Sequence, residues 1–167
     1  MSESKPTEPT GRPISFEGLY HTGIVVTDLD QAREEIGAAL SVHWGSNIQN
    51  ELPVWTPDGV KDVRFHCTYS CEGPHRLELV QSVPGTVWDG GNHLGAHHLG
   101  WWADDLEEAG QHLADRGLRL VAAHHAEKGK PQFFRYYQAV AGPYIELVNS
   151  VRRPGLEKWL AESLAAG

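Results

Sequence analysis

Apolar side chains alternate with polar or small ones along residues 20–26 and again along residues 97–103, which is the pattern of a half-buried β-strand. After each of these runs, leucine, alanine and isoleucine recur at three-to-four spacing, which predicts a helix with one apolar face. The expected N-caps of the two helices are Thr27/Asp28 and Asp104/Asp105. Three strand-like runs follow each helix. The predicted helices are 29–40 and 106–116, and the later strands are 42–48, 63–70 and 76–82, then 118–124, 132–140 and 144–150.

The two halves also repeat residue by residue. His21, Gly23, Asp28, Leu29 and Ala32 recur at a constant offset as His98, Gly100, Asp105, Leu106 and Ala109. A second match joins residues 77–82 (LELVQS) to residues 145–150 (IELVNS), with a shorter interval in the second copy. The Pro-, Asp- and Gly-containing stretch 53–62 is the expected place for the extra length of the first copy.

The repeat predicts an α+β fold built from two βαβββ modules in one domain. The terminal segments are expected to differ from it, with a polar, Pro-rich start that is disordered and a helical end that packs on the domain or on a second subunit. The predicted boundaries are a tail over 1–14, a domain over 15–151 with modules 18–82 and 96–151 and a linker 83–95, and a C-terminal helix within 152–167.

Charge and composition narrow the function classes. The net charge of −8 argues against nucleic acid or a phospholipid surface as partner, because phosphate contacts use clustered Lys and Arg. The two cysteines, Cys67 and Cys71, form no disulfide framework. Apolar runs are short and the start is polar, so we expect neither a membrane span nor a signal peptide, and a cytoplasmic location.

Strand alternation places four polar residues on one face of the predicted sheet. The apolar neighbours of His21, Glu78, His98 and Glu146 point toward the helices, so these four point away from them. Each alone would suit an exposed sheet surface, but a carboxylate within an apolar strand is costly without a compensating cation. Two imidazoles and two carboxylates at matched positions therefore predict a site for one divalent metal ion, with Zn, Ni, Co, Mn and Fe all acceptable. His97 points to the opposite side, where it belongs to the core or hydrogen-bonds a ligand.

The chain resembles the superfamily of glyoxalase I, bleomycin-resistance proteins and extradiol dioxygenases, the vicinal oxygen chelate (VOC) proteins. The resemblance covers about residues 18–151 and rests on the four polar positions and on two segments, 96–106 (AHHLGWWADDL) and 142–147 (GPYIEL). These segments are similar to the methylmalonyl-CoA epimerase and glyoxalase I branches. The resemblance implies paired modules that curl a mixed sheet around a cleft, with metal ligands on the first and fourth strand of each module.

The resemblance further implies a metal-dependent lyase, isomerase or epimerase acting on a small oxygen-chelating carbonyl compound through a metal-stabilised enolate. Glu146 or Glu78 would move the proton. Two alternatives stay open. One is an Fe(II)-dependent dioxygenase with His21 or His98 and a carboxylate in a facial triad, and the other is a non-catalytic, bleomycin-resistance-type protein that binds an aromatic small molecule.

Further residues are predicted to face the cleft. Arg64 could pair with a substrate carboxylate, and His66 could act as acid or base. Trp102, Phe134 and Tyr136 are expected to form an aromatic wall for an apolar substrate. The expected partner is therefore a small molecule, and the sequence leaves open a homodimer with a cleft formed within one chain or between two.

Overall fold

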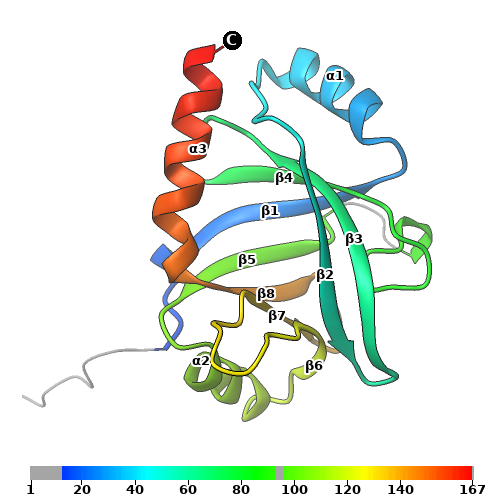
Figure 1. Cartoon of the computed structure of the whole chain (residues 1–167), viewed down its shortest axis with the longest axis vertical. Helices are drawn as coiled ribbons and strands as arrows, with labels where there is room; N and C mark the ends of the chain where they lie inside the picture. The colour runs from blue at the N-terminus through cyan, green and yellow to red at the C-terminus, as the bar shows by residue number, and fades with distance from the viewer. Residues whose placement is uncertain (1–12, 93–95, 167) are drawn as a thin grey trace, which may run out of the picture.

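The computed structural model describes residues 13–92 and 96–166, which form an eight-stranded closed barrel with three α-helices (Figure 1). Most of the predicted tail, residues 1–12, lies outside the described residues. The first module contains β1 (Leu19–Val26), α1 (Leu29–Leu40), β2 (Ile48–Thr56), β3 (Gly59–Tyr69) and β4 (Arg76–Gln81). The second contains β5 (His98–Ala103), α2 (Leu106–Ala114), β6 (Arg119–His124), β7 (Phe134–Gln138) and β8 (Tyr144–Asn149), and α3 (Arg153–Ala166) ends the chain.

The strand order around the barrel is β1-β4-β3-β2-β6-β7-β8-β5. Within each module the first and fourth strands are parallel neighbours, and the other pairs are antiparallel. The modules join twice, through β1 with β5 and through a short ladder of β2 with β6. The mixed sheet of two βαβββ modules is confirmed, and its interior closes within one chain.

One predicted strand is wrong. Residues 42–47 form only an isolated bridge between Trp44 and Ser70, and β2 begins at Ile48, where that strand was expected to end. The extra length of the first module does lie at 53–62, but as strand, since β2 and β3 continue through it to a tight turn before Gly59. Pro53 is tolerated in β2 because its nitrogen and its carbonyl both point toward β6, where the ladder has only two residue pairs. The Pro53 carbonyl accepts a hydrogen bond from the amide of His125, and the missing N–H lies at the end of that ladder.

The two module helices begin at the aspartates of the repeat. Asp28 accepts from the amide of Gln31, and Asp105 accepts from the amides of Glu107 and Glu108. The second helix ends two residues before the predicted end, at Ala114, and Gly117 follows in the left-handed conformation with φ of 85°. The described residues contain no helix long and apolar enough to cross a membrane.

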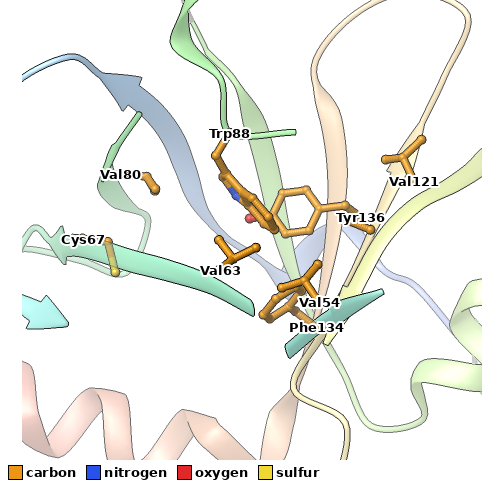
Figure 2. Close-up of a cluster of buried hydrophobic side chains, with 9 residues drawn as sticks. Val54, Val63, Cys67, Val80, Trp88, Val121, Phe134 and Tyr136 are labelled. Carbon is orange, nitrogen blue, oxygen red and sulfur yellow. The ribbon is translucent and has the colours of Figure 1, made fainter. Parts of the chain in front are cut away.

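Two apolar clusters lie on opposite faces of the sheet. One packs under α2 and includes Leu106, Ala109 and Leu147, as strand alternation predicts. The other lies inside the barrel, where Trp88 packs against Tyr136 and Phe134 (Figure 2). Trp88 is only 1% exposed although it belongs to the segment that joins the modules, so the predicted linker supplies a central core side chain.

Candidate metal centre and cavity

The His-x-Gly repeat forms a crossed contact at the junction of the modules. In the antiparallel pair of β1 and β5, Gly23 lies opposite His98 and Gly100 lies opposite His21. A Cβ atom on either glycine would collide with the imidazole of the opposite strand. Each module therefore supplies a histidine together with the glycine that makes room for the other module's histidine, and both rings are fully buried.

The parallel neighbours of these strands bring in the carboxylates. Nε2 of His98 lies 2.8 Å from Oε2 of Glu78 and 3.4 Å from Oε2 of Glu146. Nε2 of His21 lies 3.0 Å from Oε2 of Glu146 and 3.5 Å from Oε2 of Glu78, and the two Nε2 atoms are 3.0 Å apart. The four predicted ligands thus converge, with ligand atoms within 4.8 Å of one another.

Protein groups alone leave this cluster incompletely paired. Oε2 of Glu146 is buried and has no hydrogen-bond partner among the described residues, although Nε2 of His21 is near it. A buried, unsatisfied carboxylate oxygen is costly, and a cation at the centre of the cluster would compensate it. Two imidazole nitrogens and two carboxylate oxygens are also a suitable donor set for a divalent transition metal, so the residues fit the ion that the sequence predicted.

His97 fixes the orientation and tautomer of His98. Its Nε2 donates to the carbonyl of Val87 at 2.6 Å, so in the neutral ring Nδ1 carries the lone pair. That atom then accepts from Nδ1 of His98 at 2.8 Å, which leaves Nε2 of His98 free to bind a metal. A histidine ligand held through its other ring nitrogen is the usual arrangement in metal sites.

Charge coupling in the cluster shifts two pKa values. Burial acts to lower the pKa of His98, but its hydrogen bond with Glu78 and the charges of both carboxylates outweigh burial and raise it. Burial acts to raise the pKa of Glu78, yet the hydrogen bond with His98, the charges of both imidazoles and the hydroxyl of Tyr69 lower it. Without a metal, the cluster therefore favours a proton on His98, and metal binding would displace that proton.

The carboxylates open onto a cavity of 710 Å³ inside the barrel. Its walls are largely aromatic, and among them the pKa values of Tyr20, Tyr69 and Tyr136 are raised well above normal by burial and by the charges of Glu78 and Glu146. The phenols therefore stay protonated and can donate hydrogen bonds toward the carboxylates. Residues of α3 line the cavity beside those of the barrel.

Comparison with known proteins agrees with this geometry. A sequence model described as the Glyoxalase/Bleomycin resistance protein/Dioxygenase superfamily matches residues 20–137. The chain belongs to this superfamily. No curated protein matches the sequence significantly.

Solved structures of methylmalonyl-CoA epimerases share the VOC fold at low identity. The enzyme from Mycobacterium tuberculosis is 23% identical, with a TM-score of 0.55 over 79% of this chain and 87% of that one. A Streptomyces coelicolor epimerase in complex with 2-nitronate-propionyl-CoA is 20% identical, with a TM-score of 0.54 over 78% and 92%. An epimerase in complex with methylmalonyl-CoA and NH4+ is 21% identical, with a TM-score of 0.54 over 78% and 92%. At these identities the likeness concerns the fold.

Three of the five further residues predicted at the cleft line this VOC cavity, namely Trp102, Phe134 and Tyr136. The expected orientation of Arg64 and His66 is wrong. Arg64 is exposed and pairs with Glu51 at 3.2 Å, and His66 lies 3.4 Å from Gln49 on the same outer face.

The physical reason is strand parity. Phe65, Cys67 and Tyr69 alternate with Arg64 and His66 along β3, and these three residues line the cavity instead. The predicted acid-base role for His66 and carboxylate pairing for Arg64 therefore have no support from the geometry.

Trp88 and Arg152 are among the cavity residues that the sequence did not predict. Trp88 reaches the interior from the connecting segment, and Arg152 reaches the rim from the turn Ser150–Arg152 that precedes α3. An apolar residue flanked by turn residues belongs to no periodic pattern, so the size of the Trp88 side chain was the only sequence signal for its burial. Arg152 stands next to Arg153, and the sequence alone does not show which of the two faces the cavity.

Proposed function

We propose that this VOC protein is a metal-dependent enzyme that moves a proton next to a carbonyl group of a small, oxygen-chelating substrate. The observation that carries the proposal is the buried cluster of His21, His98, Glu78 and Glu146, whose carboxylates open onto an aromatic cavity. A divalent ion held by these residues would supply Lewis-acid polarisation of substrate oxygens, which acidifies the neighbouring C–H bond.

Glu78 and Glu146 are the proposed proton-transfer groups. Both line the cavity, where a bound substrate would meet their carboxylates. The carboxylate that removes the proton can return it to another carbon, which would be isomerisation, whereas delivery of a proton to the opposite face by the other carboxylate, in its protonated form, would be epimerisation. The apolar wall around them would exclude water from the exchange. That solved relatives with this fold are epimerases supports the same reaction class.

The four-residue set favours this reaction over the alternatives. An Fe(II) dioxygenase of the facial-triad kind needs only three protein ligands and open positions for oxygen. A protein that merely sequesters an aromatic compound needs no buried carboxylates, because they cost desolvation free energy.

The test combines metal content with proton exchange. We expect about one metal ion per purified wild-type chain by elemental analysis. We expect its loss in His98→Ala and Glu146→Ala, while Glu51→Gln, at the exposed ion pair with Arg64, serves as the matched control that retains it. In deuterated buffer, metal-loaded wild type should exchange the α-protons of at least one compound from a panel of 2-oxo acids, hydroxyketones and acyl thioesters.

The same experiments can overturn the proposal. If wild type binds none of Zn, Ni, Co, Mn or Fe after reconstitution, the proposed metal centre is refuted, and the proposed enzyme activity is refuted with it. If the protein retains metal but exchanges the α-protons of no compound in the panel, the proton-transfer reaction is refuted and a metal-dependent binding protein is the remaining interpretation.

A further inference from the structure

Arg152 is the only lysine or arginine among the described residues that line the cavity. Its guanidinium lies over the ring of Phe133, with Cζ 4.3 Å from the ring centroid. The imidazole of His124 also stacks on Phe133, with the ring centroids 4.2 Å apart. The arginine side chain is thus positioned by an aromatic contact, which leaves its five N–H donors available.

Arg152 lines the cavity from a point six residues beyond Glu146 along the chain. Glu146 lies in the middle of β8, Val148 lines the cavity two residues later, and Arg152 follows in the next turn. At a rise of about 3.3 Å per residue, the strand covers roughly 10 Å from Glu146 to its end at Asn149. The charge of Arg152 also acts on Tyr20 and Cys67, which line the same space.

Two basic residues that follow Arg152 in α3 each have a carboxylate partner on the same helix. Nε of Arg153 lies 2.8 Å from Glu157, and Nζ of Lys158 lies 3.8 Å from Glu162. A ligand with several phosphates would need clustered, unpaired cations at the mouth of the cavity. This rim offers one guanidinium, which suits a single carboxylate.

We propose that Arg152 is an anion-binding residue and that the ligand of this site is an aromatic or similarly apolar oxygen chelator with a carboxylate at the end remote from the metal. The proposal rests on the function proposed above. Two vicinal oxygens would face the His/Glu cluster, the apolar body would pack against the cavity-facing sides of Trp88, Phe134 and Tyr136, and the carboxylate would meet Arg152. A ligand of this class is much smaller than a coenzyme A thioester.

The probes are benzohydroxamates, which chelate metals through two adjacent oxygens, with either a carboxylate or a carboxamide at ring position 3 or 4. Carboxylate and carboxamide have nearly the same size, so their comparison isolates charge. Binding to zinc-loaded protein is followed by quenching of Trp88, Trp102 and Trp159, which line the cavity. The variants are Arg152→Gln, Arg152→Lys and the matched control Arg153→Gln.

We expect at least one carboxylate isomer to bind wild type about tenfold more tightly than its carboxamide. Arg152→Gln should abolish that preference, Arg152→Lys should keep part of it, and Arg153→Gln should keep all of it. Equal binding of carboxylates and carboxamides to wild type would overturn the role of Arg152 while leaving the metal centre intact. Displacement of the probe by acetyl-CoA would overturn the ligand class, and failure of every hydroxamate to bind would count against the proposed function itself.

Discussion

Replacing Gly23 with alanine tests whether the crossed contact between modules builds the metal centre. The added Cβ would overlap the imidazole of His98. That ring cannot easily move, because its Nδ1 is held through His97 to the carbonyl of Val87 and its other side faces Tyr136, with ring centroids 5.2 Å apart. Either β1 and β5 must separate or His98 must leave the cluster.

The magnitude follows from the burial of both groups. Overpacking a buried site costs about 1–3 kcal/mol, and the fully buried, hydrogen-bonded ring of His98 points to the upper half of that range. For a chain of this size such a loss lowers Tm by roughly 5–10 °C. Displacement of one metal ligand should weaken metal binding by at least about 10–100-fold, the usual effect of disturbing a ligand's support. Gly100→Ala should be milder, since Nδ1 of His21 has no partner among the described residues and its ring can yield.

The assay is thermal unfolding with and without zinc, together with competition against a chromophoric chelator. Gly18→Ala is the control, because it stands just before β1 and its Cβ would have its nearest neighbours at an ordinary 3.4 Å. Wild-type metal affinity and wild-type Tm in Gly23→Ala would refute the reasoning. So would equal losses in Gly18→Ala, because the effect would then not depend on the contact with His98.

Three further predictions concern the support of the site. Replacing His97 with phenylalanine should weaken zinc binding about 10–100-fold in chelator competition, because the hydrogen bond that holds Nδ1 of His98 is lost. An unchanged zinc affinity would show that His97 does not support the metal ligand His98. In metal-free protein, the raised pKa of His98 stabilises the fold below its ordinary value of 6.5, and this contribution is lost as the pH rises through the folded-state pKa, so Tm should decline as the pH rises above 6.5. The substitution His98→Gln should flatten this decline, and a flat wild-type profile would contradict the raised pKa of His98. Trp159→Ala should lower the free energy of unfolding in urea by about 2 kcal/mol and make α3 accessible to protease, because it removes the ring that packs beside Gly45 and the hydrogen bond to Ser46. A wild-type digestion pattern would mean that other contacts hold α3 in place.

Much of the site could be read from the sequence because the chain repeats itself. Strand alternation and the matched positions of His21, Glu78, His98 and Glu146 were enough to predict that they share a face, and the structure brings them together. The same reasoning failed on β3, where Arg64 and His66 were assigned to the cavity. Along β3 the apolar set, which includes Phe65 and Cys67, faces the barrel interior rather than a helix, so assigning the apolar face to the helix side exchanged the two sets.

The strand boundaries of the first module show a second limit. Residues 42–47 carry a strand-like pattern but pair with the rest of the sheet only through the bridge at Trp44, whereas the Pro- and Gly-containing stretch after Pro53 continues the ladder. Local propensity cannot decide between them, because a strand becomes stable only where a neighbour supplies hydrogen bonds and a packed face. That neighbour is β3, and its pairing is a property of the assembled sheet.

The sequence by itself determined the two βαβββ modules, the helix caps and the identity of the four converging His and Glu residues, because periodicity and repetition can be read directly along the chain. Only the tertiary structure decided that the barrel closes through β2 and β6, that Trp88 from the connecting segment fills its interior, and that Arg152 rather than Arg153 reaches the cavity. These features depend on contacts between segments far apart in sequence, and no periodic pattern encodes which distant partner a turn or an isolated side chain will meet.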